Sequence, residues 1–142
     1  MENARDCLPS SPNDSLHALL RRVPAFRALV RSVECRLFER FLPLEEPVLD
    51  LGCGDGSFGS VLFDARPVFA GVDPDASALR EAAEHQVYRH LVAAAGAALP
   101  FPNDFFGTVM ANSVLEHIAD VDTMLQEVSR VLRPGGYLLF TV

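Results

Sequence analysis

Residues 48–56 read VLDLGCGDG and are the strongest indication of the fold in this sequence. Its first four residues form a short, largely apolar run that stops at a glycine, as a buried strand does before a turn. Glycines at positions 52, 54 and 56 form the turn, and a helix is predicted over residues 57–65. Such a loop lets the backbone approach a ligand closely, and the helix N-terminus offers it free N–H groups.

Strand and helix patterns alternate from this loop onward. Further strands are predicted at residues 67–72, 87–92, 106–111 and 137–142, and further helices at 75–86 and 121–132. Pro74 is expected in the first turn of the helix at 75–86, where its missing N–H costs nothing. Asp120 is placed to cap the helix at 121–132, which Pro134 and two glycines should stop. The alternation predicts an α/β fold with a mostly parallel, doubly wound, Rossmann-like sheet.

The residues before the loop follow other patterns. Residues 1–14 are polar and predict a flexible tail, and residues 15–44 predict an N-terminal helical segment, with helices near 15–22 and 24–42. In the longer helix, apolar residues recur at three- and four-residue steps. They are expected to pack against the domain at 45–142, although such a helix could also cover a pocket: Phe26, Leu29, Val30, Val33, Leu37, Phe38 and Phe41. Six arginines are expected on a solvated helix face and not at a nucleic-acid site: Arg21, Arg22, Arg27, Arg31, Arg36 and Arg40.

Composition narrows the classes of function. The 142 residues fit one domain, and 49% hydrophobic with 22% charged residues is ordinary for a globular protein. The net charge of −7 disfavours nucleic acid and anionic membranes as partners. No apolar run approaches the roughly 20 residues of a membrane span, and no signal peptide is recognisable, so a cytoplasmic protein is expected. Scattered cysteines at 7, 35 and 53, without clustered histidines, predict no metal site.

The charges of the glycine loop favour one class of ligand over another. The glycines alone also match the G-x-G-x-x-G pattern of dinucleotide-binding proteins, at Gly54, Gly56 and Gly59. A pyrophosphate at this loop would meet Asp50 and Asp55, and like charges about 4 Å apart cost roughly 4 kcal/mol at an effective dielectric constant near 20. Asp73, at the end of the next strand, is placed to accept hydrogen bonds from a ribose diol, unless it only caps a helix. The acids favour a cationic nucleoside such as S-adenosylmethionine.

Five stretches together resemble a known family. They are VLDLGCGDG at 48–56, GVD at 71–73, ALPFP at 98–102, SVLEHI at 113–118 and RVLRPGG at 130–136. In this order they are similar to class I S-adenosylmethionine-dependent methyltransferases, above all the small-molecule branch called type 11, over about residues 45–142. The resemblance implies a doubly wound sheet with the cofactor at the carboxyl ends of the first strands.

The resemblance also implies roles for individual residues. Asp50, Gly52 and Gly54 would shape the methionine end of the cofactor site. Asp73 would bind the ribose hydroxyls and Pro74 would lie near the adenine, while Asn112 would sit close to the transferred methyl group. For acceptors that must lose a proton, His117 is the best-placed candidate general base, since its ordinary pKa suits the task. A histidine that opens a helix is more often a surface or packing residue.

The sequence departs from the family at three places. Ala95 stands where the family usually has an acid that contacts the adenine amino group, and losing this hydrogen bond is expected to cost about 1.5–3 kcal/mol of affinity. Gly107 stands where Asp is common, at a strand end away from the cofactor, so an effect on stability is expected. The sequence ends at Val142, before the last strands of the family fold, and this leaves residues 137–142 as an exposed edge. A fragment, a truncated reading frame and a homodimer through that edge would each explain it.

Three functions therefore stay open. The first is methyl transfer from S-adenosylmethionine to a small-molecule acceptor. The second is a degenerate methyltransferase fold that binds a cofactor or a protein without turnover. The third, a nicotinamide-dependent oxidoreductase, is disfavoured by the loop acids and by the match at residues 130–136.

Overall fold

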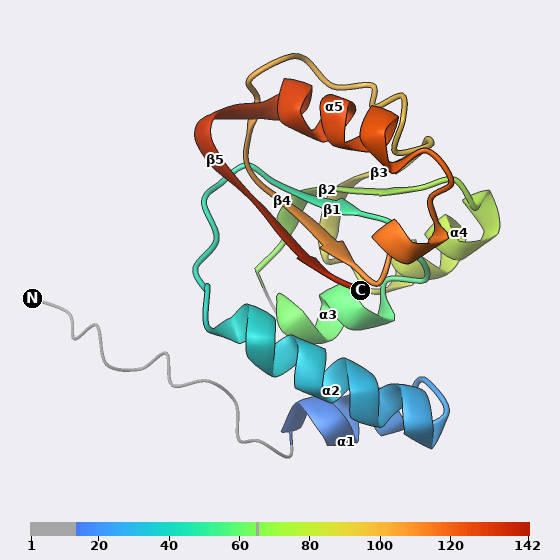
Figure 1. Ribbon diagram of the computed structural model, residues 1–142. Helices are drawn as coiled ribbons and strands as arrows, with labels where there is room; N and C mark the ends of the chain where they lie inside the picture. Colours follow the sequence, from blue (N-terminus) through green and yellow to red (C-terminus); the bar gives the residue numbers. More distant parts are fainter. Residues whose placement is uncertain (1–13, 65) are drawn as a thin grey trace, which may run out of the picture.

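A single parallel sheet forms the centre of the computed structural model, which describes residues 14–64 and 66–142 (Figure 1). Its strands are β1 (Val48–Leu51), β2 (Val68–Asp73), β3 (Tyr88–Ala93), β4 (Phe106–Asn112) and β5 (Leu132–Thr141). They lie in the order β3-β2-β1-β4-β5. All four neighbouring pairs are parallel. The predicted fold class is confirmed, while the predicted tail lies outside the described residues apart from Asp14, which begins the first helix.

Helices cover both faces of this sheet (Figure 1). They are α1 (Asp14–Leu20), α2 (Ala25–Glu39), α3 (Ser57–Leu62), α4 (Ala76–Glu84) and α5 (Val121–Val131), with a short 3₁₀ turn at Leu115–His117. Successive strand residues point to opposite faces, so Leu49 joins the core under α5 while Val48 joins the core under α1, α2 and α3. In the part of the chain that is described, no helix is long and apolar enough to cross a membrane.

Helix α2 is oriented opposite to the prediction: the face that carries most of its large apolar residues is exposed. Phe38 alone of the seven is buried, and six large apolar side chains are exposed, from 42% to 78%: Phe26, Leu29, Val30, Val33, Leu37 and Phe41. The buried face consists of Ala28, Ser32, Glu34, Cys35 and Phe38. Small side chains let the helix axis approach its neighbours closely, and a count of apolar residues overlooks such a face. The prediction that the large residues pack inward was therefore wrong.

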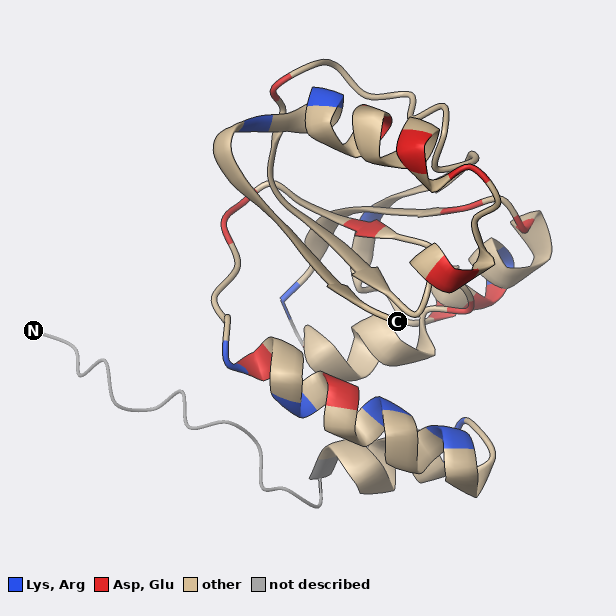
Figure 2. Ribbon diagram, in the orientation of Figure 1, with Lys and Arg blue, Asp and Glu red and all other residues tan. Residues whose placement is uncertain are grey.

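The arginines follow the expected pattern more closely. Five of them are exposed, along α2 and in the turn before it, where Figure 2 shows the blue segments: Arg21, Arg22, Arg27, Arg36 and Arg40. Arg31 is the exception, since it is half-buried and pairs with Glu34 at 2.8 Å.

Several predicted helix ends need correction, and the helices end up to three residues earlier than predicted. Helix α4 begins at Ala76, and Asp75 is its N-cap, because its carboxylate accepts hydrogen bonds from the N–H groups of Ser77 and Ala78. Pro74 therefore precedes the helix and does not occupy its first turn. Helix α3 ends at Leu62, earlier than predicted, and α5 ends at Val131 where β5 follows directly. The cap predicted for α5 is confirmed, because Asp120 accepts a 3.0 Å hydrogen bond from Thr123 N.

Gly107 has a packing reason to be glycine. It lies near the start of β4, and a Cβ built there would come within 2.6 Å of the carbonyl oxygen of Glu45. Its own N–H donates to the carbonyl of Pro47 at 2.9 Å. No side chain fits between this strand and the preceding loop, so the departure from the family's Asp concerns packing.

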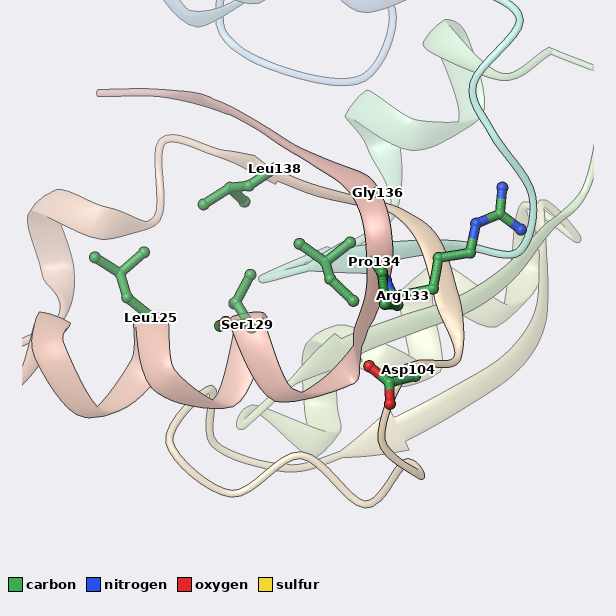
Figure 3. Close-up of a pocket in the computed structure, with 9 residues that line it drawn as sticks. Asp104, Leu125, Ser129, Arg133, Pro134, Gly136 and Leu138 are labelled. Atoms are coloured by element: carbon green, nitrogen blue, oxygen red, sulfur yellow. The ribbon is translucent and has the colours of Figure 1, made fainter.

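Strand β5 forms an edge of the described sheet. Tyr137 and Phe140 are each 52% exposed, as predicted for residues 137–142. Beside the edge lies a groove of about 420 Å³ between α5 and β5 (Figure 3). Its lining includes Leu125 and Ser129 of α5 and Pro134 and Leu138 of β5. It follows the amino-terminal part of β5, away from the glycine loop, which lies at the carboxyl end of β1.

Candidate functional site

The glycine loop lies where the strand order reverses, between β1 and β4. Beyond the end of β1, the N–H groups of Gly52 and Cys53 both donate to the carbonyl of Val72, at 2.7 and 3.0 Å. Gly52, Gly54 and Gly56 all have positive φ, at 72°, 53° and 75°. Side chains rarely adopt this conformation, so the loop needs its glycines. Open α/β sheets bind ligands at such a switch point, outside the carboxyl ends of the strands.

Two of these glycines have opposite surroundings. A Cβ on Gly52 would overlap the side chain of Val114, so this glycine lets the segment after β4 pack against the loop. A Cβ on Gly54 would meet no atom within 4 Å. The loop therefore faces open space at Gly54, whereas at Gly52 it packs against the side chain of Val114.

Asp73 ties this loop to the end of β2. Its Oδ2 accepts a 3.0 Å hydrogen bond from Gly54 N, and its Oδ1 accepts a 2.8 Å bond from Asp75 N. It does not cap α4, which was the alternative reading from the sequence. Carboxylate oxygens can accept more than one hydrogen bond each, so Asp73 keeps capacity for further donors.

Asp50, on β1 just before the loop, is buried and bonded to a tyrosine. It is 3% exposed, and its Oδ2 accepts a 2.6 Å hydrogen bond from the hydroxyl of Tyr88, at the start of β3. Burial raises the pKa of Asp50 to about 7, the hydrogen bond from Tyr88 lowers it, and the charge of Asp73 raises it. Asp50 was predicted to repel a pyrophosphate as an anion, and this part of the prediction was wrong, because its carboxyl group is buried and its pKa is raised. Asp55 and Asp73 supply the charge at the loop.

Tyr88 reaches Asp50 because two glycines leave room for it. A Cβ on Gly71 of β2 would lie 2.9 Å from Cδ1 of the tyrosine ring, and one on Gly59 of α3 would overlap its hydroxyl. Gly59 completes the dinucleotide pattern in the sequence, but in the structure its missing side chain accommodates Tyr88. A glycine inside a strand or helix often marks such a close approach, and this signal could have revealed the pair.

The rest of the loop leads into α3. Asp55 accepts a 2.9 Å hydrogen bond from Ser57 N, and so satisfies an N–H group in the first turn of the helix. Cys53 is buried, and burial raises the pKa of its thiol.

Asn112 ends β4 beside the loop and is buried in a polar cluster. Its Nδ2 donates to Glu34 Oε2 at 3.1 Å, and its Oδ1 accepts from the hydroxyl of Thr141 at 2.7 Å. Glu34 and Thr141 lie far from Asn112 in the sequence, on α2 and β5, and sequence reasoning missed both.

The other predicted residues lie nearer the surface. Pro74, Ala95 and His117 are exposed, and Ala95 lies in the loop after β3. His117 ends the 3₁₀ turn and does not open α5. Its position is that of a surface residue close to the carboxyl end of β4.

Two motifs of the family resemblance contact one another. Arg130 donates to the carbonyls of Leu99 and Phe101, each at 2.8 Å, and Glu127 accepts a 2.9 Å bond from Leu99 N. The stretch at 98–102 is thereby fastened to α5. This pairing is structural and lies outside the glycine loop.

Comparisons with known proteins agree with this architecture. The methyltransferase domain of type 11 matches residues 49–140. A malonyl-(acyl-carrier protein) O-methyltransferase of Pseudescherichia vulneris is 34% identical over 125 residues, which are 88% of this chain and 47% of that protein. An uncharacterised methyltransferase of Mycolicibacterium gilvum is 38% identical over 91 residues, which are 63% of this chain and 36% of that protein. A solved Pyrococcus horikoshii protein is 25% identical with a TM-score of 0.71, and the match covers 84% of this chain and 58% of that one.

Fold and loop together define a Rossmann-like domain of the class I methyltransferase kind. The chain belongs to the methyltransferase-domain family, in its type 11 branch. It spans between about a third and a half of the length of the curated relatives described above.

Proposed function

We propose that this chain binds S-adenosylmethionine at the glycine loop and transfers its methyl group to a small-molecule acceptor. The observation that carries the proposal is the loop itself: Gly54 faces open space at the carboxyl end of β1, and its N–H is held by Asp73. Membership of the methyltransferase-domain family supports the same reading.

The residues at the loop suit such a cofactor. Backbone without side chains can approach the methionine portion at Gly52 and Gly54. The carboxylates of Asp55 and Asp73 favour a ligand that carries a sulfonium and an ammonium over one that carries a pyrophosphate. Asp50, buried beneath the loop with Tyr88, would shape this end from below.

Each remaining residue has a proposed role. Bound S-adenosylmethionine supplies an electrophilic methyl group on a sulfonium. Asp73 would accept hydrogen bonds from the ribose hydroxyls, Pro74 would lie beside the adenine, and Asn112 would stand near the transferred methyl group. The main contribution of the protein is then to hold donor and acceptor in line. His117 would take a proton only from an acceptor that must lose one.

Relatives suggest where a search for the acceptor should begin. Three malonyl-(acyl-carrier protein) O-methyltransferases are 34%, 33% and 32% identical to this chain. Malonyl thioesters are therefore the first acceptors to test, with methyl transfer to a free carboxylate oxygen as the reaction. A carboxylate needs no general base, so His117 would be dispensable with this acceptor.

Thermal melts and a label-transfer assay test the proposal. S-adenosylmethionine or S-adenosylhomocysteine at 100 times its dissociation constant should stabilise the chain by about 2.7 kcal/mol, and nicotinamide dinucleotide should not. Methyl-labelled cofactor should then label an acceptor. Stabilisation by the cofactor without methyl transfer to any acceptor would favour the degenerate fold. Ala95 supports that alternative, because the family usually has an acid at this position. No stabilisation at millimolar cofactor would contradict cofactor binding.

A further inference from the structure

A buried carboxylate on α2 stands at the carboxyl ends of β4 and β5. Glu34 is 8% exposed, and three side-chain groups donate to it. They are Arg31 Nη1 at 2.8 Å, Asn112 Nδ2 at 3.1 Å and Ser113 Oγ at 3.1 Å. The first two donate to Oε2 and the third to Oε1, so both carboxylate oxygens are engaged.

This carboxylate determines which way the amide of Asn112 points. The Thr141 hydroxyl donates its hydrogen to Asn112 Oδ1 at 2.7 Å, while Asn112 Nδ2 donates to Glu34. A flipped amide would place its oxygen against the carboxylate of Glu34, where two acceptors repel. One amide hydrogen of Asn112 and part of its carbonyl oxygen are not used by these two bonds.

The same carboxylate holds the residue after Asn112 in an unfavourable conformation. Ser113 has a φ of +51°, which is uncommon for a residue with a side chain. Its hydroxyl accepts from Arg31 Nη1 at 2.8 Å and donates to Glu34, and its N–H donates to Thr141 Oγ1 at 3.1 Å. Strained backbone persists where its surroundings fix it, and such residues are frequent at active sites.

The strained turn leads directly to the glycine loop. Val114 follows Ser113, and its side chain occupies the space that a Cβ on Gly52 would need. Glu34 thus connects helix α2 with the end of β4 and, through the turn, with the loop that would hold the cofactor.

We propose that Glu34 is a positioning residue for methyl transfer: its carboxylate fixes the Asn112 amide and the Ser113 turn beside the transferred methyl group. The inference rests on the proposed function, because it assigns a role in that reaction. Gln at this position would fill the same space, but it offers one acceptor oxygen for three donors and removes the charge paired with Arg31.

The test compares Glu34→Gln with two controls in the whole chain. Phe38→Leu disturbs the buried face of α2 one turn further on, without touching the cluster, and Glu81→Gln makes the same chemical change on the exposed surface of α4. We measure the Kd for S-adenosylhomocysteine, the kcat and KM with the acceptor that wild type methylates, and the ¹⁵N resonances of the Asn112 amide group.

Glu34→Gln should lower kcat about tenfold or more, because small misplacements of reacting groups are costly, while Kd changes less than threefold. Its Asn112 amide resonances should shift, and Glu34→Asp should recover part of kcat. Both controls should keep the wild-type resonances, and kcat within about twofold. The proposal is overturned if Glu34→Gln keeps wild-type kcat, or if Phe38→Leu lowers kcat as much at equal loss of thermal stability.

Failure of the proposed function would be recognised separately. If wild type binds cofactor but methylates no acceptor, the methyltransferase proposal fails, and kcat and KM cannot be compared between the variants. The amide resonances then decide whether Glu34 positions Asn112, and unchanged resonances in Glu34→Gln would refute that role.

Discussion

Replacing Asp50 with Asn should make the protein more stable above neutral pH. The carboxyl group of Asp50 is buried, and burial raises its pKa from an ordinary 3.8 to about 7. In the unfolded chain it ionises near its ordinary value, so between these two pH values the folded state keeps a proton that the unfolded state has lost. The contribution of Asp50 to stability is therefore full below pH 3.8 and is lost as the pH rises toward 7.

The size of the effect follows from the difference between the two pKa values. They differ by about 3 (7 − 3.8), and each pKa unit corresponds to about 1.4 kcal/mol, which gives on the order of 4 kcal/mol across this range. Asn keeps a carbonyl oxygen that can accept the hydrogen bond of Tyr88, and it has no charge to bury. Asp50→Asn should therefore gain stability relative to wild type as the pH rises, and the gain should level off above about pH 7.

Urea unfolding of both proteins between pH 4.5 and 8.5 measures this difference. Asp104→Asn makes the same chemical change at an exposed position and serves as the matched control for the substitution itself. Tyr88→Phe removes a hydrogen bond that lowers the pKa of Asp50, so in that variant the pKa should rise further. A stability difference between Asp50→Asn and wild type that stays constant over the whole pH range would contradict a raised pKa of Asp50. A carboxyl resonance of Asp50 that titrates near pH 4 would contradict it too.

Three further predictions concern packing and the sheet edge. Phe38→Ala on the buried face of α2 should lower the free energy of unfolding in urea by about 3–5 kcal/mol. Val33→Ala on the exposed face should change it by no more than about 0.5 kcal/mol. Equal losses would contradict the observed orientation of the helix. Gly107→Ala should cost about 1–3 kcal/mol, because its Cβ would lie 2.6 Å from a backbone oxygen, and an unchanged unfolding midpoint would show that the loop yields. Tyr137→Lys should weaken self-association through the β5 edge in sedimentation velocity; a wild type that stays monomeric at high concentration would exclude a homodimer there.

Local patterns in the sequence predicted all five strands in their order along the chain, although β5 begins at Leu132 and not at residue 137 as predicted. The apolar run before the glycines, the alternation that follows it and the N-cap of α5 each depend on residues within a few positions of one another. The orientation of α2 was not accessible in this way. Its buried face includes the small residues Ala28, Ser32 and Cys35, and a periodicity count gives greater weight to the large residues on the opposite face.

The candidate site was predictable where it consists of loop backbone. Gly52 and Gly54 have the positive φ that their loop requires, and Asp73 lies beside them as expected. The partners of the buried acids were not predictable, because Tyr88 is 38 positions from Asp50 and Asn112 is 78 positions from Glu34. Contacts over such distances depend on how helices and strands pack, and a single sequence contains only indirect signs of them, such as the glycines that make room for Tyr88.

Calorimetric binding of S-adenosylhomocysteine to wild type, Gly54→Ala and Gly135→Ala tests most directly whether the glycine loop holds the cofactor. Both glycines have positive φ, 53° and 81°, and a Cβ on either would meet no protein atom within 4 Å. Alanine should therefore cost each position a similar backbone strain, about 1–2 kcal/mol. Only Gly54 faces the proposed cofactor site, so Gly54→Ala should weaken binding tenfold or more while Gly135→Ala binds like wild type. Equal binding by all three proteins, or none by wild type, would contradict the claim that this loop holds the cofactor.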